Sequence, residues 1–129
     1  MPAHGLDDLK NSGINLESIP PATYTTTQVG TACDMTGTQG PIRAIIQLGA
    51  ISDTSTAVVT FTECATSGGS YTAITGAPTV TLSATGDNAV TVSDLFERKL
   101  QYLKATLTLG GSSISAVVGV SFSAAAVSY

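Results

Sequence analysis

The sequence predicts an all-β domain, an antiparallel β-sandwich of about eight strands. Three observations lead to this prediction. Short stretches in which apolar and hydroxyl side chains alternate recur along most of the chain, as expected for strands with one buried face. Gly, Pro, Asp and Ser separate these stretches at short intervals, which is typical of turns. Threonine, a β-branched residue that suits the exposed face of a strand, occurs 20 times among 129 residues.

Residues 1–22 precede the alternating part and are predicted to form an extended N-terminal arm, with residues 23–129 as a single β-sandwich domain. Gly5 and Gly13 would interrupt a helix, and Pro20-Pro21 would stiffen the end of the segment. A frayed terminus is the alternative, but the many apolar side chains favour an arm laid on a neighbouring subunit. The residues expected to make these contacts are Leu6, Leu9, Ile14, Leu16, Ile19, Pro20 and Pro21. Deletion of residues 1–22 is therefore expected to leave the domain folded.

Eight segments of the remaining chain are predicted to be strands, each bounded by turn residues. They cover residues 23–29, 43–51, 56–63, 70–75, 79–83, 89–92, 100–109 and 114–124. Residues 52–55 and 86–88 are predicted turns, because their side chains can hydrogen-bond their own backbone. Residues 93–97 could cap one short helical turn, since Ser93 and Asp94 can accept from free backbone N–H groups.

Alternation also predicts which side chains face the core. The inward residues are expected to be Ala57, Val59, Phe61, Val80, Leu82, Leu103, Ala105, Leu107, Leu109, Ala116, Val118, Val120 and Phe122. Residues 43–51 are almost continuously apolar, so this strand is predicted to be covered on both sides. Two facing antiparallel sheets of about eight strands fit a jelly roll best. An immunoglobulin-like sandwich comes second, because the chain lacks the tryptophan that usually marks its core.

Charge argues against direct nucleic-acid binding. The net charge is −4, and the five basic residues form no basic stripe. Charged residues make up only 11% of the chain, whereas Ser, Thr and Ala are abundant. A surface of this kind is poorly protected against association, which suits a protein packed against copies of itself or a partner. No apolar run approaches the length of a membrane span, and no signal-peptide layout is present, so a soluble protein made in a cytoplasm is expected.

Catalytic chemistry finds little support in the residue types present. Glu63-Cys64 beside the 67–70 loop could be a nucleophile with an acid, but His4, the only histidine, lies in the predicted arm and is poorly placed to activate a thiol. Cys33 and Cys64 are expected to be free, partly buried thiols. The acidic residues lie mostly in turns, where they are expected in any β protein, so a paired-carboxylate site is disfavoured. The chain is therefore predicted not to be an enzyme.

Cofactor and ligand motifs are equally sparse. Zinc usually requires two or three histidines or cysteines, which one subunit does not assemble here. Asp53-Thr54 and Asp87-Asn88 supply oxygens that could bind calcium, but turn chemistry explains both pairs. The Gly-Gly pairs lack the continuation of a phosphate-binding loop. With seven aromatic residues and no tryptophan, a sugar-stacking platform is weakened. No cofactor or metal is predicted.

The region from Ile45 to Val120, about two thirds of the chain, resembles small structural proteins of tailed bacteriophages. The shared pieces are GAISD, a second strand ending in Glu, a Gly-containing loop followed by an aromatic residue, AITGA, V-x-V-S-D-L, and R-K-x-x-Y-L-K-A. They occupy residues 49–53, 58–63, 68–71, 73–77, 90–95 and 98–105. Two features depart from the family pattern: Tyr71 stands where Trp or Phe is common, and the long N-terminal segment is not obviously shared.

The resemblance implies a jelly-roll capsid decoration (cement) protein or a related head or tail accessory protein. Such a protein would form a homotrimer on the outside of a phage capsid, bind the major capsid protein and stabilise contacts between capsomers in the virion. A trimer could bury the Thr/Ala-rich outer face that the chain presents at Val117, Gly119 and Ser121 and at Thr106 and Thr108. The apolar C-terminus with Val127 and Tyr129 is a further candidate interface. The alternative is a carbohydrate- or receptor-binding β-sandwich module of a phage tail or fibre.

Overall fold

The computed structural model describes residues 13–52, 54–82 and 89–126. It confirms the prediction of an all-β protein built as an antiparallel β-sandwich. The strands are β1 Gly13–Tyr24, β2 Gln28–Val29, β3 Cys33–Asp34, β4 Thr38–Ile51, β5 Ser55–Cys64, β6 Thr72–Ala73, β7 Val80–Leu82, β8 Ala89–Val92, β9 Tyr102–Gly111 and β10 Ala116–Ala126. The part of the chain that the structure describes contains no helix.

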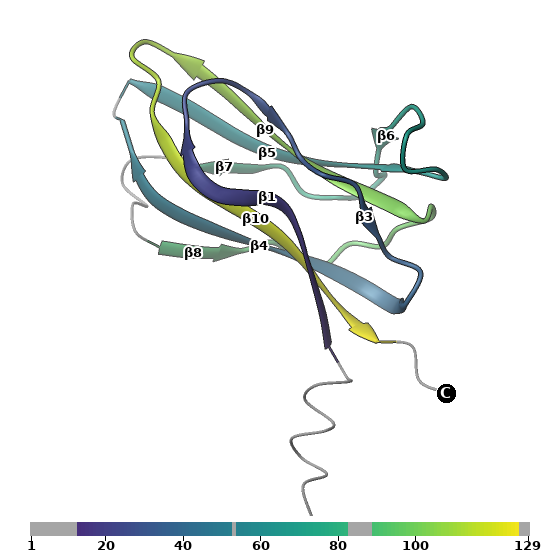
Figure 1. Cartoon of the computed structure of the whole chain (residues 1–129). Coiled ribbons are helices and arrows are strands. Elements are labelled where there is room, and N and C mark those ends of the chain that lie inside the picture. Colours follow the sequence, from purple (N-terminus) through teal and green to yellow (C-terminus); the bar gives the residue numbers. More distant parts are fainter. Residues whose placement is uncertain (1–12, 53, 83–88, 127–129) are drawn as a thin grey trace, which may run out of the picture.

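Two sheets face each other across the core (Figure 1). The first has the strand order β1-β10-β4-β8, and the second has the order β2-β9-β5-β6, with β3 paired to β9 and β7 paired to β5. Successive strands change sheet at β1–β2, β3–β4, β4–β5, β7–β8, β8–β9 and β9–β10. All strand pairings in the described part of the chain are antiparallel, and each sheet has one face on the core and one face outward.

Most of the residues that alternation predicts to face inward lie in the core, together with others that it did not name, such as Phe96. Val59, Leu107 and Phe122 are fully buried, and nearly all of the predicted inward side chains are buried as well. Phe61 stacks on Phe96 with ring centroids 5.1 Å apart, and Phe122 meets both rings edge-on. Aromatic pairs in these geometries add stabilisation beyond simple area burial. This cluster joins β5 of one sheet to β10 of the other.

Strand β4 corrects one prediction. Its apolar run was expected to be covered on both sides, but burial alternates along it: Ala44, Ile46 and Leu48 are buried, whereas Arg43 and Gln47 are exposed. An apolar run indicates burial on both faces only where something covers the outer face, and in this chain β4 packs on one side alone. Its outward face is therefore open.

Residues 93–97 correct a second prediction, because they form no helical turn. Ser93 Oγ instead accepts a hydrogen bond from the backbone N–H of Ala44 at 2.9 Å. Phe96 then forms an isolated antiparallel bridge with Ile42. Ser93 therefore hydrogen-bonds a neighbouring strand rather than the start of a helix, and residues 93–96 continue alongside β4 beyond the end of β8.

The predicted arm of residues 1–22 overlaps strand β1. Residues 1–12 lie outside the described part, but Gly13–Tyr24 pair with β10 along nearly the whole length of both strands. Two register shifts occur, one between Glu17 and Ile19 and one between Ile19 and Ala22, and the second spans Pro20 and Pro21. Proline cannot donate to a ladder and is confined to edge strands or bulges, and β1 is such an edge. The second half of the predicted arm is thus a strand of the sandwich.

Candidate interaction surface

The pair Glu63-Cys64 is divided between two sides of β5. Consecutive residues of a strand point to opposite faces. The Glu63 carboxylate is buried and accepts hydrogen bonds from the backbone N–H groups of Lys99 at 2.8 Å and Leu100 at 3.0 Å. Cys64 Sγ lies 3.9 Å from Thr66 Oγ1, and a Cβ added to Gly69 would lie only 2.6 Å from that sulfur. Glu63 therefore anchors the 99–100 backbone, and the following loop covers Cys64.

Cys33 is likewise a buried, free thiol. Its Sγ donates to the backbone oxygen of Glu17 at 3.5 Å and lies 3.7 Å from that of Thr31. Burial raises the pKa of the Cys33 thiol to about 11, a rise that the nearby Ser18 hydroxyl opposes and the Glu17 charge reinforces. The thiol is protonated at neutral pH and so is a poor nucleophile or metal ligand.

The other chemistry-bearing residues do not converge. Within residues 13–52, 54–82 and 89–126, no three His, Cys, Asp or Glu side chains come together as a metal site would require. His4, Asp53 and Asp87 lie outside those ranges, and Asp94 and Glu97 are exposed next to β8. Among the same residues, no helix is long and apolar enough to cross a membrane.

The residues predicted to make subunit contacts fall into three groups. Leu6, Leu9, Val127 and Tyr129 lie outside the described residues. Ile14 and Leu16 are half-buried, and Ile19 is 1% exposed and belongs to the core of its own domain. Only Pro20 and Pro21 of the described set are exposed. The apolar character of the N-terminal segment thus reflects, in its second half, packing within the chain.

The outer face of the β9–β5 sheet is lined by hydroxyl groups, and we call it the threonine face. Its outward side chains on β5 and β9 are Thr56, Val58, Thr60, Thr62, Tyr102, Lys104, Thr106 and Thr108. The Lys104 ammonium lies 4.3 Å from the centroid of the Tyr71 ring. This cation–π contact occupies the ring face that a sugar would need for stacking.

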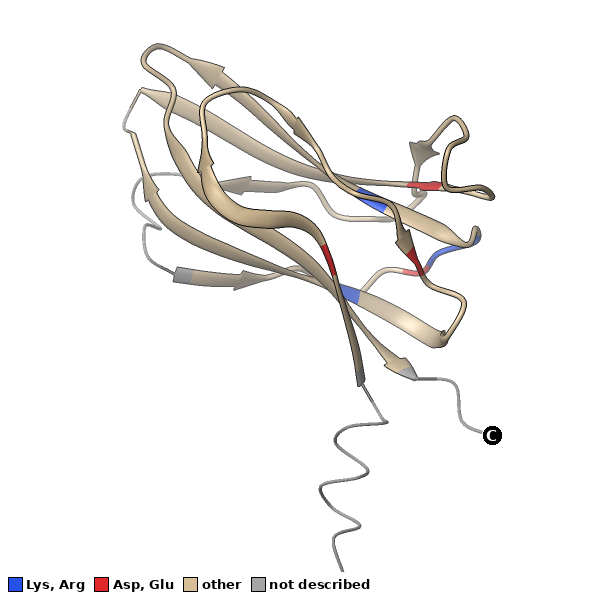
Figure 2. Ribbon diagram, in the orientation of Figure 1, with Lys and Arg blue, Asp and Glu red and all other residues tan. Residues whose placement is uncertain are grey.

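The outer face of the β1-β10-β4-β8 sheet is different, and we call it the β10 face. Strand β10 presents Val117, Gly119, Ser121, Ser123 and Ala125 outward, because the alternate residues are buried. Glu17 and Arg43 are the only charged residues within the four described strands of this sheet. Figure 2 shows the same scarcity of charge along these strands. The face therefore carries few charges, and most of the outward side chains of β10 are small.

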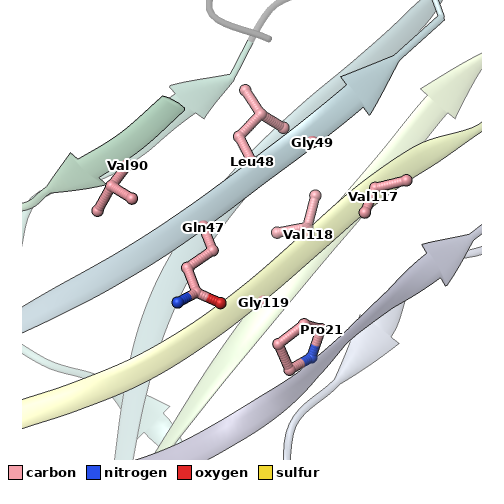
Figure 3. A pocket seen from close by; sticks show the side chains of 8 residues that line it. All are labelled: Pro21, Gln47, Leu48, Gly49, Val90, Val117, Val118 and Gly119. Carbon is pink, nitrogen blue, oxygen red and sulfur yellow. The ribbon is translucent and has the colours of Figure 1, made fainter. Parts of the chain in front are cut away.

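A groove of about 380 Å³ runs over the middle of the β10 face. Its lining is Pro21, Gln47, Leu48, Gly49, Val90, Val117, Val118 and Gly119, and Figure 3 shows Pro21 and Gln47 on opposite sides of β10. Glycine is required at the centre: a Cβ on Gly119 would lie 2.7 Å from the Pro21 ring, and one on Gly49 would lie 2.8 Å from Val117. Close packing of these neighbours shapes the groove.

The edge of the β10 face carries the most exposed large apolar side chains of its sheet. Val90 is 63% exposed and Val92 is 49% exposed on β8, and Leu95 just beyond is 55% exposed. Single exposed apolar residues are ordinary, but a contiguous set beside an apolar groove marks an interaction site. Sequence reasoning missed Val90 and Val92, because a four-residue strand with two valines reads equally well as half-buried in either direction.

No protein-family model matches the chain, and no curated protein matches it either. The case for function therefore depends on the surfaces described above.

Proposed function

We propose that the chain is a non-enzymatic structural protein of a virion, which binds the outside of a phage capsid as a homotrimer and stabilises contacts between capsomers. The observation that carries the proposal is the scarcity of charge on the strands of both outer faces of the sandwich: Glu17 and Arg43 on the β10 face, and Lys104 and the edge residue Asp34 on the outer face of the other sheet. Solvent-facing surfaces ordinarily mix many charges of both signs. Faces like these suit a protein covered by other protein.

The strand order also supports a jelly roll, which we propose as the topology. An eight-stranded jelly roll consists of two antiparallel sheets with Greek-key connections, and the chain here crosses between the sheets at most of its connections. Jelly rolls recur in viral capsid proteins and in lectins. The fold alone does not choose between those roles, so the choice rests on the surfaces.

The placement of chemical groups supports a structural role as well. Glu63 is committed to two backbone N–H groups and Cys33 is buried as a protonated thiol. Decoration requires many weak contacts and high copy number rather than a reacting group.

The test uses heads of the phage that carries the gene, prepared with that gene deleted. Purified protein added back is expected to sediment with the heads. At saturation, the number of copies bound at each contact between capsomers should be a multiple of three. The bound protein should also raise the temperature at which the heads release DNA. Protein lacking residues 1–12 should bind these heads more weakly, because that segment contains the predicted contact residues Leu6 and Leu9. Intact protein that leaves the heads unbound and equally heat-sensitive would overturn the proposal.

The alternative, a carbohydrate- or receptor-binding module, is favoured by one observation, the hydroxyl-rich threonine face. A glycan array separates the two functions: several related glycans bound by the protein, with binding lost in Thr106→Val but retained in Val90→Asp, together with no affinity for heads, would favour the alternative.

A further inference from the structure

We propose that the β10 face binds the β10 face of a second copy of this chain, around a two-fold axis that runs along β10. In such an isologous contact, each residue on one side of β10 meets a residue on the other side of the partner's β10. The inference goes beyond capsid binding, and it applies to the purified protein without any shell.

The residues of the β10 face form a grid that such an axis can match. Hydrogen-bonded pairing gives the rows across the sheet. One row holds Pro21, Gly119, Gln47 and Val90, since Gly119 pairs with Gln47, Gln47 with Val90, and Pro21 closes on Gly119. The next row holds Glu17, Ser121, Ile45 and Val92. A rotation about β10 exchanges the two sides of each row, so the groove wall at Pro21 meets the partner's Gln47 and Val90.

Charge selects this axis. Glu17 lies on the β1 side of β10, and Arg43 lies on the β4 side, opposite Ser123. Rotation about β10 therefore brings Glu17 of one copy over the β4 side of the other copy. The two positions differ by two residues, about 7 Å along a strand, which the long arginine side chain can span. The contact would contain two Glu17–Arg43 pairs, one on each side of the axis.

A second in-plane axis, perpendicular to β10, would leave each residue on its own side of β10. Glu17 would then never lie over the β4 side that carries Arg43, so no Glu17–Arg43 pair could form at any position of this axis. Centred on the Glu17 row, it would also place Glu17 over Glu17, an unfavourable contact between like charges. Both axes keep the strands of the two sheets aligned as stacked sheets prefer, so charge rather than backbone geometry decides between them.

The floor of the face permits close approach. On this axis the two β10 strands lie over one another. Their outward residues Gly119, Ser121, Ser123 and Ala125 are small, and the outward Val117 would meet Val117 of the second copy. The larger apolar side chains, Val90 and Val92, stand at the edge and would cover the partner's β1 side. Small central residues flanked by larger apolar ones let two sheets interlock without a void.

The test is charge reversal read by mass in analytical ultracentrifugation. The wild-type protein should reach an even state, a dimer or, if trimers also form, a hexamer. Glu17→Arg alone and Arg43→Glu alone should each halve that mass and weaken the contact roughly a hundred-fold or more. An equimolar mixture of the two variants should regain the full mass, because every Arg then faces a Glu across the axis. This recovery on mixing cannot arise from contacts within one chain.

Two exposed valines give the matched control. Val90→Asp should halve the mass, whereas Val29→Asp should not, because Val29 is 66% exposed but lies on β2 of the other sheet. Far-ultraviolet circular dichroism and the melting temperature establish that each variant is folded.

Four outcomes would overturn the inference. The first is a wild-type protein that is a monomer, or contains an odd number of copies, at every concentration. The second is a single charge reversal that leaves the mass unchanged, and the third is a mixture of the two variants that does not regain the mass. The fourth is a mass that rises when residues 1–12 are deleted, which would mean that this segment covers the β10 face. Heads bound normally by a protein that never forms the even state would refute this contact and leave the capsid proposal standing. A protein that forms the even state but does not bind heads would refute the capsid proposal and leave this contact standing.

Discussion

Ser18 and Glu63 are buried polar side chains, and each holds backbone that its own strand ladder does not reach. Glu63 accepts from two N–H groups, and Ser18 Oγ accepts from Ala105 N–H at 3.0 Å while donating to the Thr31 carbonyl at 3.0 Å. A buried polar group without such partners would cost about 1–3 kcal/mol. The alternation of apolar and polar residues predicted most of the apolar core, because the side chains of a strand point alternately to its two faces whatever its partner strands are. It could not predict these two residues, whose partners are distant in sequence.

The Cys33 thiol predicts a pH dependence of stability. The unfolded thiol ionises near its ordinary pKa of 9.0, whereas burial holds the folded thiol protonated up to a pKa of about 11. Between these values the native state binds more protons than the unfolded state, so the stability that the raised pKa contributes is present below pH 9.0 and is lost as pH rises to about 11. Urea unfolding of the wild-type protein and of Cys33→Ala at several pH values across this range measures how the free energy of unfolding changes with pH. If the free energy of unfolding changes with pH equally in the two proteins, the raised pKa of Cys33 is contradicted.

At the scale of elements, β1 is the strand that sequence reasoning interpreted differently. The irregular spacing of Ile14, Leu16 and Ile19 does not predict a strand, and Pro20-Pro21 indicates a stiff end to an extended arm. The two register shifts in the pairing with β10 explain both features, since each shift moves the alternation by a residue and prolines fit where the ladder is interrupted. A strand whose alternation of apolar and polar residues is interrupted by bulges cannot be recognised from that alternation until its partner strand is known.

The junction of β1 with β9 gives a prediction about Gly30. Its N–H donates to the Ala105 carbonyl at 2.8 Å, and an added Cβ would lie 2.2 Å from Ser18 Oγ and 2.8 Å from two backbone oxygens. Gly30→Ala is therefore expected to destabilise the fold by about 1–3 kcal/mol, as overpacking does. Chemical denaturation measures the loss.

Gly68 is the matched control for that substitution, because nothing lies within 4 Å of a Cβ at that position. Gly68→Ala should leave stability within about 0.5 kcal/mol of wild type, as surface substitutions usually do. A Gly30→Ala protein as stable as Gly68→Ala would show that the β1–β9 junction yields more easily than the contacts indicate.

At the scale of the whole molecule, the architecture was predictable and the outer surfaces were only partly so. Composition and turn spacing predicted two antiparallel sheets, and the low charge predicted association. Which face carries the groove depends on the close approach of Gly119 to Pro21 and of Gly49 to Val117, and the two members of each pair are far apart in sequence. A surface site assembled by strand pairing needs the topology before its residues can be recognised.

Truncation separates the two halves of the N-terminal segment. Removing residues 1–12 should leave the melting temperature unchanged, because β1 begins at Gly13. Removing residues 1–22 should abolish the cooperative thermal transition, since it deletes the buried Ile19 and Ser18 and exposes the edge of β10. This outcome replaces the expectation that residues 23–129 fold alone. A cooperative melt of the shorter protein, followed by circular dichroism, would restore that expectation.

The adjacency of the two ends of the sandwich has a mechanical consequence. Gly13 pairs with Ala125, so the start of β1 and the end of β10 lie side by side at one pole of the domain (Figure 1). Tension applied through both chain ends would load the hydrogen bonds between these strands one pair at a time, like a zipper opened from its end, because the bonds run perpendicular to the strands. Such a geometry yields at low force. A domain of this design resists pulling poorly through its termini, and any load it bears in an assembly must enter through its broad faces.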